Sequence, residues 1–129
     1  MHKWMIITGA LFSLTSVVLG AFAAHGLKNI LPEVSITVFQ TATQYQMFHG
    51  IALILCGIFS LQLQQTKTNT YWLNVAAVCF LSGILFFSGS LYGLALSGPG
   101  WLGPITPVGG LLFIIGWASL ALAAVKIKV

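Results

Sequence analysis

The sequence predicts an all-α integral membrane protein, a four-helix bundle in which one domain covers residues 1–129 and both termini are cytoplasmic. Of the 129 residues, 58% are apolar, only 5% are charged, and Glu33 is the single acidic side chain. A water-soluble domain draws about a quarter of its residues from Asp, Glu, Lys and Arg. Four apolar stretches of about 20 residues or more can be placed along the chain, and each could cross a bilayer as a helix.

The first helix is expected over residues 4–24, which carry no charge. Lys3 before this run and the small residues near its end would also suit a signal peptide. The apolar core is longer than the roughly 7–15 residues of such a peptide, so we favour a retained helix. Ser16, Gly20 and Ala24 recur every fourth position, a spacing that lets membrane helices approach closely.

The second helix is expected over residues 34–63. Gly26 suits the end of the preceding helix, and Pro32 followed by Glu33 suits a first helical turn. The uncharged stretch that follows, up to Thr66, is too long for one straight crossing. Either one long tilted helix, or an interfacial helix that runs into a membrane helix, would fit it.

The third and fourth helices are expected over residues 71–96 and 105–125. Aromatic residues at the start of the third helix match the belt expected at a membrane surface. Gly89 and Gly93 form a GxxxG pair in this helix, which suggests close helix packing. A loop rich in Gly and Pro, residues 97–104, connects the two helices.

Lysine placement predicts the orientation. Four crossings put both termini and the middle connection on one side, and that side holds four of the five lysines: Lys3, Lys67, Lys126 and Lys128. Lys28 is alone on the other side, near Glu33. The positive-inside rule therefore places both termini in the cytoplasm.

Polar side chains within a bilayer are costly, so their positions are the best clue to function. At about 100° per residue, those of the second helix fall within roughly half of its circumference: Thr37, Gln40, Thr41, Gln44, Tyr45 and His49. The side chains of the later helices that could meet this stripe are Ser88, Ser90, Tyr92, Thr106 and Trp117. Two compatible interpretations stay open: hydrogen bonding between helices, or a polar pocket that opens to the external surface.

Catalysis finds little support in the sequence. Neither His25 nor His49 has a carboxylate nearby in sequence to orient it, and nucleotide-binding and zinc-protease motifs are absent. By helix rise the two histidines are expected at depths about 10 Å or more apart, which argues against a bis-histidine haem. We therefore expect no enzyme, no cofactor and no metal. The scattered lysines argue against a nucleic-acid partner.

Four ordered segments, together with Gly116-Trp117, resemble a known family. The segments are GAFAAHGL (20–27), YQMFH (45–49), FSGSLY (87–92) and ITPVGG (105–110). They are similar to small bacterial inner-membrane proteins called domain of unknown function 423, whose animal relatives include transmembrane protein 256. This chain has Ala23 where the family usually has Gly, and some relatives carry an acidic residue at the position of Gln44.

The resemblance covers essentially the whole chain and implies four membrane helices, a retained first helix and a multi-pass protein of the bacterial cytoplasmic (inner) membrane. It brings no established activity, substrate or cofactor. The family's signature residues match His25, Tyr45, Gln46, His49, Ser88, Ser90, Tyr92, Thr106 and Pro107.

The leading hypothesis is a non-enzymatic protein that binds a lipid, a small amphiphile or a membrane partner through an externally facing polar pocket. Its candidate ligand-binding residues are His25, Gln40, Gln44, Tyr45, Gln46, His49, Ser88, Ser90, Tyr92 and Thr106. The alternative is a transporter or channel subunit. That function would need a homo-oligomer, because four short helices enclose little pore alone.

Overall fold

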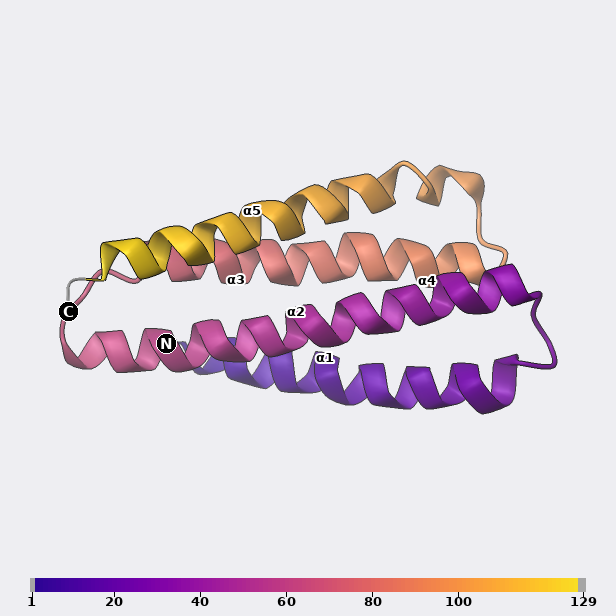
Figure 1. Cartoon of the computed structure of the whole chain (residues 1–129), viewed down its shortest axis with the longest axis horizontal. Coiled ribbons are helices and arrows are strands. Elements are labelled where there is room, and N and C mark those ends of the chain that lie inside the picture. Colours follow the sequence, from indigo (N-terminus) through magenta and orange to yellow (C-terminus); the bar gives the residue numbers. More distant parts are fainter. Residues whose placement is uncertain (1, 128–129) are drawn as a thin grey trace.

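The computed structural model describes residues 2–127 and confirms the all-α class (Figure 1). No strand occurs within this range. In chain order the helices are α1 (Lys3–Phe22), the π-helical turn η1 (Ala23–Leu27), α2 (Glu33–Gln65), α3 (Tyr71–Gly83), the π-helical turn η2 (Ile84–Ser88), α4 (Gly89–Ala95), the short 3₁₀ turn η3 (Gly100–Leu102) and α5 (Ile105–Lys126). Four long helical segments follow one another in antiparallel fashion, and α3, η2 and α4 together form the third of them.

Four segments are long and apolar enough to cross a membrane: Lys3–Leu27, Glu33–Gln65, Tyr71–Ala95 and Gly100–Lys126. The first span continues to Leu27, beyond its predicted end at residue 24, and Gly26 does not end the helix. Instead it widens into η1, where a Cβ at Gly26 would lie 2.7 Å from the ring of Phe22. Gly26 thus leaves room for the ring of Phe22, which lies against the surface of this helix one turn away.

The second span is one continuous helix of 33 residues, so the polar and apolar halves of this stretch belong to a single helix. Glu33 is its first residue and so lies in the first turn, as predicted, but Pro32 precedes the helix with an extended backbone (ψ 151°). At 1.5 Å per residue, α2 is about 50 Å long. That exceeds a hydrocarbon core of about 30 Å, so α2 must tilt or extend beyond it.

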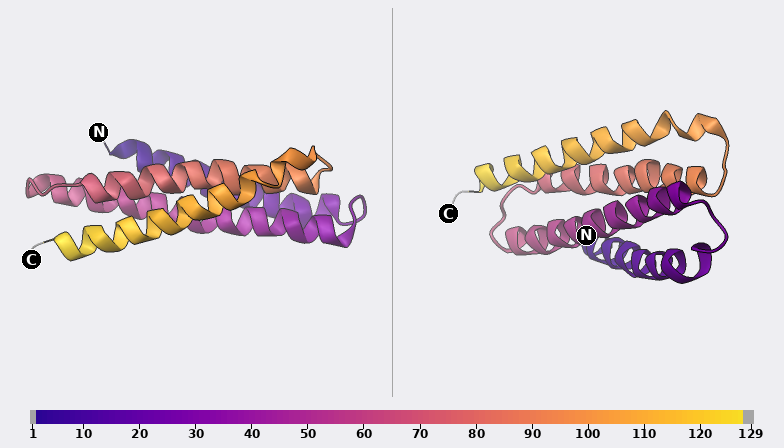
Figure 2. Two further views of the ribbon diagram at one scale, coloured as in Figure 1. Left: turned by 90° about the horizontal axis from the view of Figure 1, so that it is seen from above. Right: turned by 45° about the vertical axis from the view of Figure 1, so that its right-hand side comes forward.

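The helices pack in a chain of pairs. The main contacts join α1 to α2 and α3 to α5, and α2 also packs against α3 and α4 (Figure 2). Glycine allows the closest approach of α1 and α2, because a Cβ at Gly9 would lie 2.5 Å from the carbonyl oxygen of Gly50. In the second pair, Gly83 lies against the ring of Phe113, and Gly116 lies against the ring of Phe80.

The small-residue patterns read from the sequence are not the main packing points. A Cβ at Gly89 would meet nothing within 4 Å, and one at Gly93 would meet only a side chain of the neighbouring loop, so the GxxxG pair forms no helix-packing face. Of the small residues on the first helix, Ser16 is buried but Ala24 is exposed. The closest contact between α1 and α2 is at Gly9 and Gly50 instead, nearer the N-terminus of α1 than the predicted residues.

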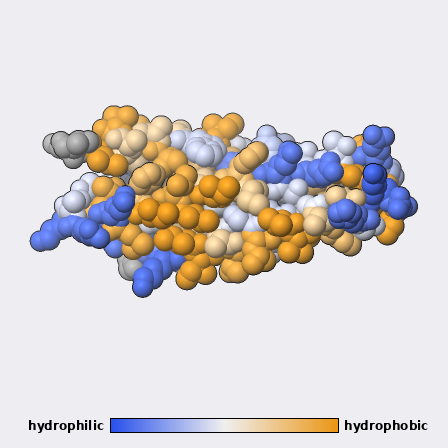
Figure 3. All heavy atoms as spheres, turned by 60° about the horizontal axis from the view of Figure 1, so that its bottom comes forward, coloured by the Kyte–Doolittle hydropathy of each residue, from blue (hydrophilic) through white to orange (hydrophobic). Residues whose placement is uncertain are grey.

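The lysines lie at the two ends of the molecule as the topology requires. Lys3, Lys67 and Lys126 are at the end that contains the α2–α3 connection, which we call the lysine-rich end. Lys28 and Glu33 are at the opposite end, called here the Glu33 end. Lys128 lies outside the described residues. Figure 3 shows a broad hydrophobic band between two hydrophilic ends, as expected of a membrane protein.

Candidate functional site

Gln46 is the polar centre of the packing between three helices. Its side chain is only 4% exposed. Its amide nitrogen donates to the carbonyl oxygen of Phe12 (3.0 Å) and to the hydroxyl of Thr15 (2.7 Å), both on α1. Its amide oxygen accepts a hydrogen bond from the hydroxyl of Tyr92 on α4 (2.6 Å). With both amide hydrogens donated and the oxygen bonded, little capacity remains for a ligand.

Three more of the predicted residues bond one helix to another. The fully buried Ser88 lies in the π-helical turn η2 and donates to the carbonyl oxygen of Ala42 on α2 (2.8 Å). Ser90 on α4 meets Thr106 at the start of α5, with 2.6 Å between their hydroxyl oxygens. These bonds bear out the first of the two interpretations for this part of the polar set, since Ser and Thr commonly join membrane helices.

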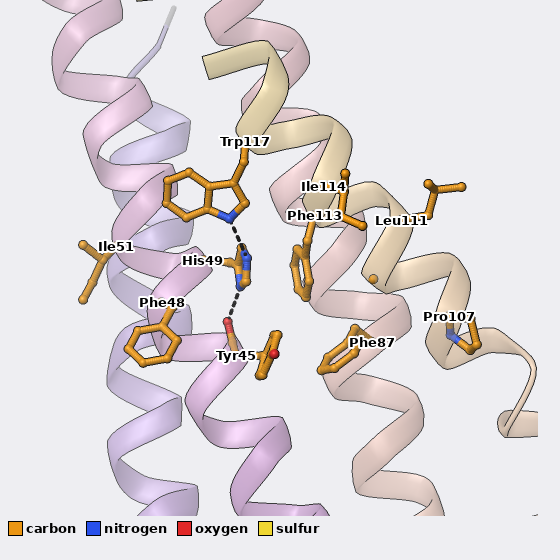
Figure 4. Close-up of a pocket in the computed structure, with 11 residues that line it drawn as sticks. Tyr45, Phe48, His49, Ile51, Phe87, Pro107, Leu111, Phe113, Ile114 and Trp117 are labelled. Atoms are coloured by element: carbon orange, nitrogen blue, oxygen red, sulfur yellow. Dashed lines mark hydrogen bonds between the residues drawn. The ribbon is translucent and has the colours of Figure 1, made fainter. Parts of the chain in front are cut away.

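His49, midway along α2, joins this helix to α5 (Figure 4). Its Nδ1 lies 2.6 Å from the carbonyl oxygen of Tyr45, and the indole nitrogen of Trp117 donates to its Nε2 across 3.1 Å. A carbonyl can only accept, so Nδ1 carries the proton, and Nε2 must be the unprotonated acceptor. The imidazole also stacks on the ring of Phe113, with centroids 3.5 Å apart and planes 8° apart.

A groove of about 810 Å³ lies between α2 and α5, beside His49. It is partly open to one side, and η2 contributes to its wall. The lining is almost entirely apolar: Tyr45, Phe48, His49, Ile51, Phe87, Pro107, Gly110, Leu111, Phe113, Ile114 and Trp117. We call this space the α2–α5 groove. Its aromatic wall is continuous, because the ring of Phe87 packs on those of Tyr45 (4.6 Å between centroids) and Phe113 (5.4 Å).

The hydroxyl of Tyr45 is the one polar side-chain group of this wall that remains available. Tyr45 is 40% exposed, and its hydroxyl makes no hydrogen bond within residues 2–127. His49 and Trp117, by contrast, use their ring nitrogens on each other and on the backbone. The groove can therefore offer a ligand a large apolar surface and one hydroxyl.

Three predicted residues neither line this groove nor bond to another helix within the described residues. His25 is exposed in η1, near the Glu33 end. Gln40 and Gln44 are exposed on α2, and neither side chain makes a hydrogen bond within the described residues. Gln40 lines a separate hollow at the Glu33 end.

The structure thus divides the predicted set into three groups. Half of the ten members hold helices together, Tyr45 and His49 line the groove, and the remaining three are exposed. Sequence reasoning missed most of the groove wall, including Phe48, Ile51, Phe113 and Ile114. An apolar side chain in an apolar helix gives no contrast in the sequence, so no signal could have singled these residues out.

The comparisons with known proteins place the chain in a family. A family model described as "Protein of unknown function (DUF423)" matches residues 19–110. A UPF0382 membrane protein of Staphylococcus aureus (strain bovine RF122 / ET3-1) is 46% identical over 124 residues, which cover 96% of this chain and 97% of the relative.

Two further relatives come from other genera. The UPF0382 membrane protein YwdK of Bacillus subtilis (strain 168) is 41% identical over 96% of this chain and 98% of its own length. A UPF0382 membrane protein of Haemophilus influenzae (strain ATCC 51907 / DSM 11121 / KW20 / Rd) is 42% identical over 98% of this chain and 97% of its own length. No solved structure matches. The chain belongs to the UPF0382 family of bacterial membrane proteins, the family described by the DUF423 model.

Proposed function

We propose that this protein binds the apolar part of a lipid or small amphiphile in the α2–α5 groove, as a binding protein without catalytic activity. The observation that carries the proposal is the groove itself. Its volume of about 810 Å³ is within the roughly 300–1,000 Å³ typical of small-molecule sites. Such sites are mainly apolar and aromatic with a few polar groups that orient the ligand.

The hydrogen bonds of the wall favour an apolar ligand over a polar one. A polar ligand would have to compete for His49 with Tyr45 and Trp117, which already satisfy both of its ring nitrogens. An acyl chain makes no such demand, and it gains from contact with Phe113 and Ile114. The hydroxyl of Tyr45 can then bond to a single polar group of the ligand, such as an ester or a carbonyl.

The chain offers a matched pair of glycines for the test. Gly110 lines the groove, and a Cβ there would lie 3.8 Å from the ring of Phe87, an ordinary contact. A Gly110→Leu side chain should therefore enter the groove without breaking the helix packing. Gly89 is exposed with nothing within 4 Å of a Cβ, so Gly89→Leu makes the same chemical change elsewhere.

The measurement is mass spectrometry of the intact protein released from a mild detergent with its bound lipid. We expect the wild type and Gly89→Leu to retain an adduct of lipid mass, and Gly110→Leu to lose it severalfold. Equal retention by the two leucine variants would refute the groove as the binding site. Circular dichroism at matched concentration checks that both variants remain helical.

We further propose that the protein spans the bacterial inner membrane with its lysine-rich end in the cytoplasm. The support is the placement of Lys3, Lys67 and Lys126 at one end, because cytoplasmic loops of membrane proteins carry an excess of lysine. Fusion of a cytoplasm-dependent reporter to the C-terminus should give signal. Insertion of the same reporter at Ile30, in the connection between η1 and α2, should give no signal.

The alternative function, a homo-oligomeric transporter or channel, would need a polar path shared between subunits. Within residues 2–127 the buried side chains of Gln46, Ser88 and Ser90 are committed to bonds between or within helices, which favours the groove over a pore. Reconstituted vesicles provide the test. Protein-dependent flux of ions or small metabolites would reverse this preference.

A further inference from the structure

The Glu33 end carries a second hollow, separate from the α2–α5 groove and sharing no lining residue with it. Its volume is about 520 Å³, and it lies between η1 and the start of α2. The lining combines small and apolar side chains with four polar ones: Ala23, Ala24, Lys28, Leu31, Glu33, Ile36, Thr37 and Gln40. We call it the Glu33 hollow.

The Glu33 hollow brings together the chain's single acidic side chain and the only lysine of this end. Both Lys28 and Glu33 are exposed, and they form no ion pair with each other in the described part of the chain. Every other lysine lies at the opposite end or outside the described residues. Two opposite charges that share one hollow without being paired can each bind the opposite charge of a ligand.

Two further polar side chains of the hollow are free to bind. The hydroxyl of Thr37 donates to the carbonyl oxygen of Glu33 (3.0 Å), so its own oxygen can still accept a hydrogen bond. The side-chain amide of Gln40 makes no hydrogen bond within residues 2–127, and it can both donate and accept. The hollow therefore offers donors and acceptors beside both charges.

The position of the hollow points to the source of the ligand. The first span ends at Leu27 and the second begins at Glu33, so the hollow lies where the apolar spans give way to polar chain. Phospholipid headgroups occupy that depth in a bilayer. The apolar walls formed by Leu31 and Ile36 would suit the glycerol and the first carbons of the acyl chains better than a free metabolite.

We propose that the Glu33 hollow binds a phospholipid headgroup that carries both a phosphate and a primary ammonium, as phosphatidylethanolamine does. The phosphate lies at Lys28, and the ammonium donates hydrogen bonds to the carboxylate of Glu33 and to the amide oxygen of Gln40. A choline headgroup carries the same charges but has no N–H to donate. This inference does not depend on the α2–α5 groove, and the two sites fail or hold separately.

The test compares the lipids retained by the full chain. The protein is equilibrated in micelles with equal amounts of phosphatidylethanolamine, phosphatidylcholine and phosphatidylglycerol, and its bound lipid is quantified by mass spectrometry. For exposed charge pairs we expect a preference of about three- to fivefold for ethanolamine over choline. Glu33→Gln keeps the side-chain shape and should bring this ratio close to one.

The lysine variants separate the two halves of the headgroup. Lys28→Gln should lower retention of ethanolamine and choline lipids alike, because both carry the phosphate. Lys67→Gln removes the same charge at the lysine-rich end and should leave retention unchanged. Gln40→Leu keeps the start of α2 intact and should lower the ethanolamine preference even if Glu33→Gln frays the helix.

Two results would overturn the proposal. One is equal retention of ethanolamine and choline lipids by the wild type. The other is an ethanolamine preference that survives both Glu33→Gln and Gln40→Leu. Gly110→Leu should leave the preference intact, which distinguishes failure of the groove from failure of the hollow.

Discussion

The indole N–H of Trp117 donates to Nε2 of His49 across 3.1 Å, so a side chain on α5 fixes the protonation of a side chain on α2. The other ring nitrogen of His49 donates to the backbone, so the imidazole is neutral with its proton on Nδ1. A second proton on Nε2 would face the indole hydrogen and break the bond. The groove wall at this point is therefore a closed hydrogen-bond chain that needs no ligand to complete it.

Replacing Trp117 by Phe should destabilise the protein, because Nε2 of the buried His49 loses the only donor that residues 2–127 supply to it. Leaving a buried acceptor unsatisfied costs about 1–3 kcal/mol in the free energy of unfolding. The measurement is unfolding in mixed micelles with increasing dodecyl sulfate, followed by circular dichroism. Trp101→Phe is the control, because Trp101 is 66% exposed in the loop before α5. Equal midpoints for the two variants would contradict the role given to the indole nitrogen.

Gln46→Leu should loosen the contact between α1, α2 and α4, because it removes three hydrogen bonds at once. Polar contacts between membrane helices average about 0.6 kcal/mol each, so we expect a loss of about 2 kcal/mol. Gln44→Leu is the matched control, two residues away on the same helix but exposed and unbonded within the described residues. The same unfolding assay should show little change for Gln44→Leu.

The contrast between Gln44 and Gln46 shows how far the sequence could predict the site. Periodicity placed Gln44 in a polar stripe and left Gln46 out, and only the family resemblance added Gln46 to the candidates. In the structure Gln46 is buried and Gln44 is exposed. In a membrane helix an apolar residue fits either face, so the polar stripe alone could not tell which face of α2 meets the other helices.

The four spans, unlike the packing face of α2, were predictable from the sequence. Their length and lack of charge are strong signals, and the ends of α2 and α5 were found within two residues of their predicted positions. The π-helical turns were not predictable, because η1 and η2 have no composition that separates them from ordinary helix. Yet η2 matters to the site, since it carries both Phe87 and the bonded Ser88.

Ser90 and Thr106 should be energetically coupled, because their hydroxyls are 2.6 Å apart between α4 and the start of α5. A double-mutant cycle with Ser90→Ala and Thr106→Val measures the coupling free energy between the two side chains directly. We expect a coupling of about 0.5–1.5 kcal/mol. Ser90 also bonds to the carbonyl oxygen of Phe87 (3.0 Å), so Ser90→Ala alone should cost more than Thr106→Val alone. Strict additivity of the two changes would show that the contact contributes nothing.

Gly50→Ala should separate α1 from α2, whereas Gly89→Ala should be harmless or stabilising. A Cβ at Gly50 would lie 2.8 Å from the hydroxyl oxygen of Ser13 and 3.1 Å from the carbonyl oxygen of Gly9, and the latter is backbone that cannot turn aside. Overpacking of this kind costs about 1–3 kcal/mol. At Gly89 the added methyl group meets nothing within 4 Å, and alanine gains up to about 1 kcal/mol over glycine in a helix.

The two alanine variants make the same chemical change with opposite expected signs, so any general effect of lost glycine cancels between them. The dodecyl sulfate midpoint should fall for Gly50→Ala and stay or rise for Gly89→Ala. A fall for Gly89→Ala as large as that for Gly50→Ala would mean that the exposed face of α4 is covered in the membrane. In that case the GxxxG pair would regain its role, as a contact with another protein chain instead of a contact within this one.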